Sequence, residues 1–437
     1  MDFQYKNVLI WGYGVSGRSV EKVLTDIGCK YSILDESIKI DGGNYLSKIT
    51  KKNILNFDLI VLSPGVDVNR KEIVYAESFG IDVISEVEFG YMFLPSQTKV
   101  IAVTGTNGKT TTVELIYNLL KLAGKSVAAL GNIGNPLSQV YGKNYDYIVV
   151  ELSSFQLQKI KYFKADIAVL LNIAPDHLDR HGTFENYIDA KLNIFNNQSK
   201  KDYAILNMDN EIIRNIKIAN VNRIYYSMCG NKAKYTMINN IIKKSNKKCV
   251  EIDNGVPRVF LGNVLVCYIV ADILGVSCEI FDNLLKVFEF LPHRYEFVTR
   301  IHNISFINDS KATNAHATNW ALTCTESDDT LLLLGGRNKD LEFDEIFLRN
   351  GHKLKRIVAF GECRKKIYGL RKKYKNVEFF LEKNLETLLD NIDSYLSEID
   401  TVLLSPACAS FDEFASYIER GDYFKKRVLE MSREYEK

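Results

Sequence analysis

A short apolar run that stops at a glycine-rich turn is the feature that most constrains the fold of this 437-residue chain. Residues 100–103 read Val-Ile-Ala-Val, residues 105–110 read Gly-Thr-Asn-Gly-Lys-Thr, and a segment with helical spacing of its apolar residues follows. This order predicts a strand, a phosphate-binding loop and a helix, in which Lys109 supplies a mobile charge and Thr110 a hydroxyl for magnesium. The loop is shorter than a Walker A loop, because Val103 stands where that pattern has its first glycine. A glycine-rich turn without a ligand is the alternative.

Composition excludes several classes of protein. Hydrophobic residues make up 46% of the chain and charged residues 25%, which is ordinary for a globular protein. The net charge of +2 gives no basic footprint, so we expect neither nucleic acid nor membrane as a partner. The eight cysteines include no C-x-x-C pair, which argues against a zinc site or a disulfide framework. With no signal peptide and no apolar run of about 18 residues, we expect a cytoplasmic protein, and a monomer.

The first segment carries a second glycine motif. A buried-strand pattern at residues 7–11 leads into Gly-x-Gly-x-x-Gly at residues 12–17, and the next strand ends in Asp35. This arrangement points to a dinucleotide, but any nucleotide diphosphate could use the same turn, and a tight turn without a ligand remains an alternative. A further strand at residues 59–62 ends near Gly65, at the edge of the sheet where ligands bind in open α/β folds.

Two strands of the central segment end in residues suited to a metal or substrate. The strand at residues 147–150 ends in Glu151, where a magnesium-holding carboxylate is expected, and the alternative is an exposed strand-end acid. Ser153 and Gln156 follow at the rim of the same edge. The strand at residues 167–171 runs into a segment with His177 and His181, for which ligand contact and a structural role are weighed equally.

A lysine lies on the apolar stripe of the next predicted helix. That helix starts near Thr183, a good N-cap, and Lys191 falls among its apolar positions. Snorkelling of the ammonium to water is one explanation, and periodicity alone favours it. The other is that burial favours the neutral amine, which can react with carbon dioxide to form a carbamate.

The last segment alternates strands and helices again. Strands at residues 304–308, 331–334, 357–360 and 401–404 each end in a polar or glycine-rich loop, as in a parallel doubly wound sheet. Lys311, Lys339 and Ser410 then gather at one edge, which suits an anionic small molecule. Breaks at Pro95 and Pro292 divide the chain into residues 1–94, 95–291 and 292–437. We therefore expect an α/β protein of three domains: Rossmann-like, P-loop mononucleotide-binding and Rossmann-like.

Seven motifs in chain order resemble the bacterial Mur ligase family, and most of all its members that add D-glutamate. They are residues 104–110 (TGTNGKT), 131–134 (GNIG), 151–157 (ELSSFQL), 176–180 (DHLDR), 291–294 (LPHR), 308–314 (NDSKATN) and 405–410 (SPACAS). The resemblance implies an ATP-dependent, ADP-forming amide ligase of peptidoglycan precursor synthesis. It would join D-glutamate to UDP-N-acetylmuramoyl-L-alanine through an acyl phosphate and a tetrahedral intermediate.

The resemblance also implies roles for individual residues. ATP would be bound by Gly105, Thr106, Asn107, Gly108, Lys109, Thr110, Thr111, Asn263, Arg294, Asp309 and Lys311. The UDP-substrate would be bound by Gly14, Val15, Ser16, Asp35, Gly65, Asn132, Ser153, Gln156 and His177. D-Glutamate would be bound by Thr313, Lys339, Ser410, Phe411 and Tyr417. Catalysis would rest on Lys109, Glu151, His177 and Lys191, and two Mg²⁺ sites on Thr110, Glu151, His177 and a carbamylated Lys191.

Two positions depart from the family pattern. Relatives carry His-Asn-x-x-Asn near the adenine, whereas here Asn263 matches the first Asn and Val266 replaces the second. Tyr417 stands where Phe is commoner, which adds a hydroxyl. The alternatives are a related Mur-type ligase that takes another amino acid and, in a different class, an NAD-dependent oxidoreductase built on the Gly12 turn. The oxidoreductase leaves the Gly105 loop, Glu151 and Lys191 without a role.

Overall fold

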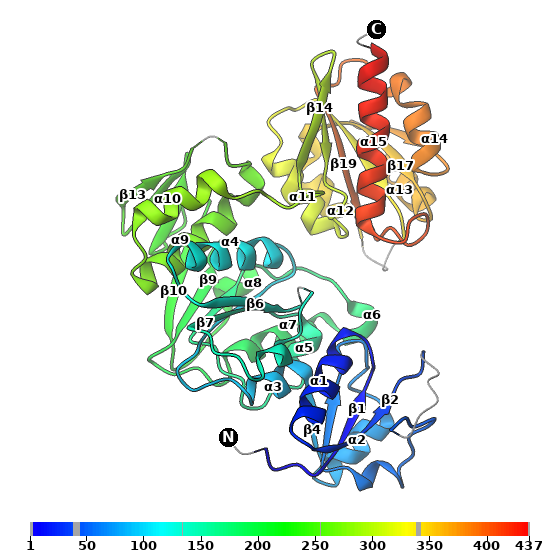
Figure 1. Cartoon of the computed structure of the whole chain (residues 1–437). Coiled ribbons are helices and arrows are strands. Elements are labelled where there is room, and N and C mark those ends of the chain that lie inside the picture. Colours follow the sequence, from blue (N-terminus) through cyan, green and yellow to red (C-terminus); the bar gives the residue numbers. More distant parts are fainter. Residues whose placement is uncertain (1–2, 38–43, 133, 254, 338–341, 436–437) are drawn as a thin grey trace. The chain divides into compact units, whose positions relative to one another are not determined.

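A computed structural model describes residues 3–37, 44–132, 134–253, 255–337 and 342–435. Contacts divide the chain into two compact units. The first comprises Met1–Ile173, Arg180–Val256 and Phe260–Phe288, and the second comprises Ala174–Asp179, Pro257–Val259 and Glu289–Lys437. Figure 1 shows two sheets in the first unit and one sheet in the second, each covered by helices. Each unit is described by itself.

The first sheet has four parallel strands in the order β2-β1-β3-β4. Its elements are β1 (Asn7–Trp11), α1 (Val15–Asp26), β2 (Lys30–Leu34), β3 (Leu59–Leu62), α2 (Lys71–Ser78), β4 (Asp82–Ser85) and α3 (Glu86–Tyr91). Because side chains alternate along a strand, Val8 and Ile10 pack with α1 and α3, whereas Leu9 packs with α2 on the other face. Both faces of the sheet are therefore buried, as expected for parallel strands.

The second sheet has nine strands in the order β13-β12-β11-β10-β9-β8-β5-β7-β6. Its strands are β5 (Lys99–Thr104), β6 (Val127–Gly131), β7 (Tyr147–Glu151), β8 (Ile167–Leu170), β9 (Tyr203–Asn207), β10 (Asn222–Ser227), β11 (Tyr235–Ile238), β12 (Ile241–Lys244) and β13 (Lys247–Glu251). Its helices are α4 (Lys109–Leu122), α5 (Ser154–Leu157), α6 (Leu178–His181), α7 (Phe184–Leu192), α8 (Glu211–Asn215), α9 (Leu261–Leu274) and α10 (Cys278–Val287). Helices α4, α9 and α10 contact one another on one face, and α5 and α7 cover the other (Figure 1).

The third sheet has six strands in the order β14-β15-β19-β16-β17-β18. Its elements are β14 (Glu296–Ile301), β15 (Ile304–Asn308), α11 (Ala315–Cys324), β16 (Thr330–Gly335), α12 (Asp344–Asn350), β17 (Leu354–Phe360), α13 (Arg364–Gly369), β18 (Glu378–Leu381), α14 (Leu385–Asp390), β19 (Thr401–Ala407) and α15 (Tyr417–Tyr435). Helices α11, α12 and α13 share one apolar cluster, and α14 and α15 share another on the opposite face. The loops after β15, β19 and β16 therefore lie side by side at the carboxyl edge.

The predicted α/β class is confirmed, and the strands expected from apolar runs are present. The four strands expected in the last segment pair parallel, and the structure adds β14, which pairs antiparallel with β15. A second antiparallel part, β11 to β13, extends the central sheet. Pro95 and Pro292 fall between sheets, while the domain boundaries themselves stay predictions. Among the described residues, no helix is long and apolar enough to cross a membrane.

A buried carboxyl in the first unit predicts a pH dependence of stability. Glu86 begins α3, is 1% exposed, and accepts a hydrogen bond from the Ser138 amide at 2.7 Å. Its other oxygen, Oε2, has no partner among the described residues, and burial raises the pKa of the carboxyl to about 7. Since the folded pKa lies above the unfolded one, the protonated carboxyl stabilises the fold at acidic pH, and this contribution is lost as the pH rises toward 7 and above.

We therefore expect Glu86→Gln to be progressively more stable than the wild type as the pH rises from about 4.5 to 8. A shift of this size corresponds to roughly 3 kcal/mol in the free energy of unfolding. The amide keeps an oxygen for the Ser138 N–H and does not ionise. Urea unfolding of both proteins at pH 5 and pH 8 measures the difference. An identical pH dependence in the two proteins would contradict the assignment.

Candidate active site

The glycine loop between β5 and α4 is held by an asparagine from the neighbouring strand end. Asn172 follows β8, and its carbonyl and Oδ1 accept from the backbone N–H groups of Thr106 and Asn107 at 3.0 and 2.8 Å. Its Nδ2 donates to the Asn107 carbonyl at 3.0 Å. Gly108 is the N-cap of α4 with φ +85°, a conformation that L side chains rarely adopt. The loop therefore has a fixed shape at the N-terminus of a long helix, where anions bind favourably.

Two lysines converge on the first residue of this loop. The ammonium of Lys109 donates to the carbonyls of Gly105 and Thr106 at 2.9 and 3.0 Å. The ammonium of Lys191 donates to the same Gly105 carbonyl at 2.9 Å. The shared acceptor places the two nitrogens within about 6 Å of each other, where two positive charges repel.

Lys191 is buried as the sharper interpretation of the sequence requires. Thr183 caps α7 by accepting from the Asn186 N–H, and Lys191 in the last turn is 2% exposed. Its ammonium lies 4.7 Å from the ring centroid of Tyr187, whose hydroxyl is 2.9 Å from Thr106 Oγ1. The snorkelling alternative is wrong, because the side chain does not carry its charge to water.

Glu151 ends β7 and is 2% exposed, so the alternative of an exposed strand-end acid is also wrong. Its Oε1 accepts from Asn132 Nδ2 at 2.8 Å, whereas its Oε2 is buried and has no partner among the described residues. Burial, and then the charge of Glu151, raise the pKa of Glu114 on α4. A buried carboxylate oxygen without a donor is the kind of ligand that a hard cation would satisfy.

Arg180, in the segment after β8, connects the two sheets of the first unit by hydrogen bonds. Arg180 donates to the carbonyls of Pro64 and Val66 at 3.1 and 3.0 Å, on both sides of Gly65. Its guanidinium lies 4.2 Å from the ring centroid of Phe155, which stacks on His181. His181 Nε2 is 2.9 Å from Ser154 Oγ. The structure thus gives His181 a structural environment, and Arg180 connects the two sheets, a role that local sequence patterns do not indicate.

The other predicted contacts of the UDP-substrate fall at two places in the first unit. Gly14 caps α1, Val15 is 64% exposed, and Ser16 follows them in the first turn. Asp35 accepts from the N–H of Tyr13 at 2.6 Å, so the carboxylate closes the glycine turn itself. Ser153 and Gln156 form a capping box at the start of α5, and Gln156 is buried.

Asn263 contacts the glycine loop and the first turns of α4, while its predicted role near the adenine stays a prediction. Its Nδ2 donates to the Gly108 carbonyl at 3.0 Å and to Thr112 Oγ1 at 2.8 Å. Thr110 is the second residue of α4, and Thr111 beside it is buried. Val266 is fully buried within α9, so it packs in the core of the unit.

In the second unit, the loop after β15 brings a carboxyl and a lysine to the carboxyl edge. Asp309 accepts from Ser405 Oγ at 2.8 Å and from the Tyr295 N–H at 3.2 Å. Burial raises the pKa of Asp309 to about 7, while the nearby charge of Arg294 acts in the opposite direction. The ammonium of Lys311 lies 3.9 Å from the ring centroid of Tyr417. Residues predicted to bind ATP and D-glutamate therefore meet at this edge.

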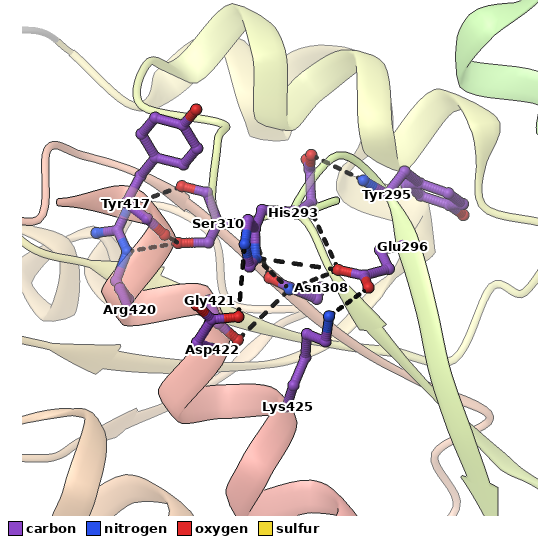
Figure 2. A network of polar contacts seen from close by, with 11 residues as sticks. His293, Tyr295, Glu296, Asn308, Ser310, Tyr417, Arg420, Gly421, Asp422 and Lys425 are labelled. Carbon is purple, nitrogen blue, oxygen red and sulfur yellow. Dashed lines mark hydrogen bonds and ion pairs between the residues drawn. The ribbon is translucent and has the colours of Figure 1, made fainter. Parts of the chain in front are cut away.

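His293 holds the base of that loop. Figure 2 shows its ring against Asn308 and Asp422, and its Nδ1 is 2.9 Å from Asn308 Nδ2. Its carbonyl accepts from the Lys311 N–H at 3.0 Å, and its burial lowers the pKa of the imidazole. His293 is thus an internal support of this unit.

Three of the five predicted D-glutamate residues lie around the loop after β19 and the start of α15. Ser410 is buried, Phe411 is 62% exposed, and Tyr417 is the first residue of α15. Thr313 follows Lys311 before α11, and Lys339 lies outside the described residues.

His177 also belongs to this unit, where its N–H donates to Asp176, and Asp176 accepts from Asn314 Nδ2 at 3.2 Å. The joint metal site of Thr110, Glu151, His177 and Lys191 stays a prediction.

A glycine loop between a parallel strand and a long helix, a buried acid with an unpaired oxygen and a buried lysine are together typical of a nucleotide-using α/β enzyme. Comparison with known proteins indicates the same class of enzyme. The Mur ligase middle domain matches residues 103–260, and the Mur ligase MurD-like N-terminal domain matches residues 6–85. The UDP-N-acetylmuramoylalanine--D-glutamate ligase of Thermoanaerobacter sp. (strain X514) is 38% identical over 99% of this chain and 100% of its own length. The enzyme of the same name from Caldicellulosiruptor bescii is 36% identical over 99% of both chains.

Solved structures give the same fold. MurF ligase from Thermotoga maritima, solved in complex with ADP, has a TM-score of 0.61 at 18% identity and covers 100% of this chain and 96% of its own. UDP-N-acetylmuramate-alanine ligase MurC from the same organism has a TM-score of 0.59 at 18% identity, covering 98% and 100%. The chain belongs to the Mur ligase family. The predictions of family, fold class and an ATP-dependent, ADP-forming ligase are confirmed.

Proposed function

We propose that this chain joins D-glutamate to UDP-N-acetylmuramoyl-L-alanine with hydrolysis of ATP to ADP, a step of peptidoglycan precursor synthesis. The observation that carries the proposal is the full-length likeness to ligases named for this reaction, at 38% identity. The first unit supplies a fixed phosphate loop and the second a carboxyl edge with Lys311 and Tyr417, which fit the two halves of such a reaction. The NAD-dependent oxidoreductase is set aside, because it explains none of these features.

The chemistry begins at the phosphate loop. The substrate carboxylate attacks the γ-phosphorus of ATP, and the bond between this phosphorus and the β-phosphate oxygen breaks. ADP departs, and the substrate now carries an acyl phosphate. Backbone N–H groups of residues 105–110 and the ammonium of Lys109 counter the charge on the transferring phosphoryl group. The amine of D-glutamate then adds to the acyl carbon, and phosphate departs from the tetrahedral intermediate as the amide forms. The amine loses a proton in this step.

Mg²⁺ would bind at Glu151 and Thr110, with His177 and the modified Lys191 as further ligands of two sites. The unpaired Oε2 of Glu151 supports this assignment. Carbamylation of Lys191 would replace a positive charge near Lys109 by a negative one, and thereby turn a repulsion into an attraction. Bound magnesium would neutralise phosphate charge and hold the carboxylate and ATP together.

The amino acid would be bound at the carboxyl edge of the third sheet. The residues proposed to bind D-glutamate are Thr313, Lys339, Ser410, Phe411 and Tyr417. Arg294, Asp309 and Lys311 are proposed to close on ATP. The UDP end would lie at Gly14, Val15, Ser16 and Asp35, with Gly65, Asn132, Ser153, Gln156 and His177 toward the sugar. We also propose that the protein acts as a monomer in the cytoplasm and that its partners are small molecules alone.

Phosphate release by the purified protein tests the substrate assignment. We expect release from ATP only when UDP-N-acetylmuramoyl-L-alanine and D-glutamate are both present, and none when either is omitted. Equal release with L-lysine or diaminopimelate in place of D-glutamate would favour a related ligase and overturn the proposal. Reduction of NAD with a hydroxy substrate would revive the oxidoreductase.

A further inference from the structure

Arg420 is a buried cation that no local pattern in the sequence indicates. It lies in the first turn of α15, is 1% exposed, and is among the largest fully buried side chains of the chain. Burial lowers the pKa of its guanidinium to about 10, so the group is charged at neutral pH. No carboxylate of the described residues forms an ion pair with it, and the charges of Asp412 and Glu413, which raise its pKa, act from beyond ion-pair distance. A buried charge without a direct ion pair is costly, so stability alone gives a poor account of this residue.

The guanidinium instead binds backbone and hydroxyl oxygens of two neighbouring strand-end loops. Its Nε donates to Ser310 Oγ at 3.0 Å, and its Nη2 donates to the Ser310 carbonyl at 2.9 Å. The same Nη2 donates to the Cys408 carbonyl at 3.0 Å. Ser310 follows β15 and Cys408 follows β19, and these two strands are adjacent and parallel. One side chain therefore connects both loops in a planar, preorganised geometry.

The residues beside these contacts are those assigned to substrates. Ser310 lies between Asp309 and Lys311, which are proposed to meet ATP, and its hydroxyl donates to the Tyr417 carbonyl at 2.8 Å (Figure 2). Cys408 lies two residues before Ser410, which is proposed to meet D-glutamate. The ammonium of Lys311 lies over the Tyr417 ring, so a second contact joins the loop after β15 to the start of α15.

A third loop also approaches Arg420. A Cβ atom on Gly336, after β16, would lie 3.1 Å from Nη1 and 2.4 Å from the Ala409 carbonyl. Nη1 itself is buried and has no hydrogen-bond partner among the described residues. The loops after β15, β19 and β16 thus meet around one guanidinium.

We infer that Arg420 is a positioning residue that sets the distance between the ATP loop (residues 309–311) and the D-glutamate loop (residues 408–411). This inference rests on the proposed function. By holding Ser310 and Cys408 with one planar group, Arg420 fixes where Lys311 stands relative to Ser410 and Tyr417. The acyl phosphate and the attacking amine must meet within reacting distance, so a small error in this spacing lowers the rate strongly.

Arg420→Lys tests the inference, because it keeps the charge and removes the planar fork. We expect the KM for D-glutamate to rise about tenfold and kcat to fall, since at least one charge-assisted hydrogen bond is lost. The KM for UDP-N-acetylmuramoyl-L-alanine should stay within about twofold, because its proposed contacts with the chain lie mainly in the first unit. Arg427→Lys is the matched control on the same helix, where Arg427 pairs with Asp390 at 2.5 Å, and it should leave all three KM values unchanged.

Ser310→Ala gives a second variant that keeps the arginine and removes only the hydroxyl between Nε and the Tyr417 carbonyl. It should raise the KM for D-glutamate severalfold, and combining it with Arg420→Lys should add little, because both act through one connection. Wild-type constants in both single variants would overturn the inference, and so would equal rises in KM for all three substrates or additive effects in the double variant. If Arg420→Lys does not fold, Ser310→Ala decides alone. A wild-type protein that ignores D-glutamate refutes the proposed function instead.

Discussion

Replacing Lys191 by alanine should reduce turnover by on the order of 1000-fold. The ammonium of Lys191 shares the Gly105 carbonyl with Lys109 and is 2% exposed, so its charge state acts directly on the phosphate loop. A carbamate forms when the neutral amine attacks carbon dioxide and loses a proton, and the resulting anion is suited to magnesium. Steady-state phosphate release with both substrates present measures the loss.

Chemical rescue separates the carbamate from a purely structural lysine. In Lys191→Ala a short carboxylic acid can enter the space left by the side chain, so acetate or high bicarbonate should restore part of the activity. Lys191→Arg is the matched control, since it keeps the charge, leaves no space and forms no carbamate on an amine. It should be inactive with and without added acid. Absence of rescue in the alanine variant, or full activity of the arginine variant, would contradict the carbamate.

Glu151→Gln should lower kcat by on the order of 100-fold and raise the magnesium concentration needed for half-maximal activity. The amide oxygen of glutamine can still accept from Asn132 Nδ2, so the local fold is kept. The position of the unpaired Oε2 is then taken by an NH₂ group, which cannot bind a cation. A magnesium titration of phosphate release measures the change.

Glu114→Gln is the control for this substitution. Glu114 lies on α4 close enough to Glu151 for that charge to raise its pKa, so the variant removes an acid from the same neighbourhood. It should retain activity within about threefold and an unchanged magnesium requirement. A magnesium requirement that is equally altered in both variants would indicate a general electrostatic effect, and would contradict a ligand role specific to Glu151.

Local patterns in the sequence predicted the elements that are locally determined. Apolar runs identified β1, β3, β5 and β7, because strands buried on both faces must be apolar throughout. Thr183 was recognised as the cap of α7 from its type and position. Strands β11 to β13 were missed because their polar and charged residues give no apolar run.

The residues of the candidate site also divide into those that local sequence patterns indicate and those that they do not. Local sequence patterns indicate the ends of strands and the apolar stripes of helices, and these are the positions of Lys109, Glu151 and Lys191. Asn172 and Arg420 were not found, because their partners are backbone carbonyls or N–H groups that are distant in the sequence. The sulfurs of Cys363 and Cys408, 45 residues apart in the sequence, approach to 3.3 Å, and this side-chain contact was not predicted either. Long-range contacts to backbone atoms leave no periodic signal in the sequence.

Transfer of labelled oxygen tests the central claim most directly. UDP-N-acetylmuramoyl-L-alanine carrying ¹⁸O in both oxygens of its terminal carboxylate is incubated with the protein, ATP, magnesium and D-glutamate. If the carboxylate attacks the γ-phosphorus, the bridging oxygen leaves with phosphate, and each inorganic phosphate released carries one ¹⁸O atom. Phosphate without ¹⁸O, formed together with the amide product, would contradict an acyl phosphate and with it the assigned role of the phosphate loop.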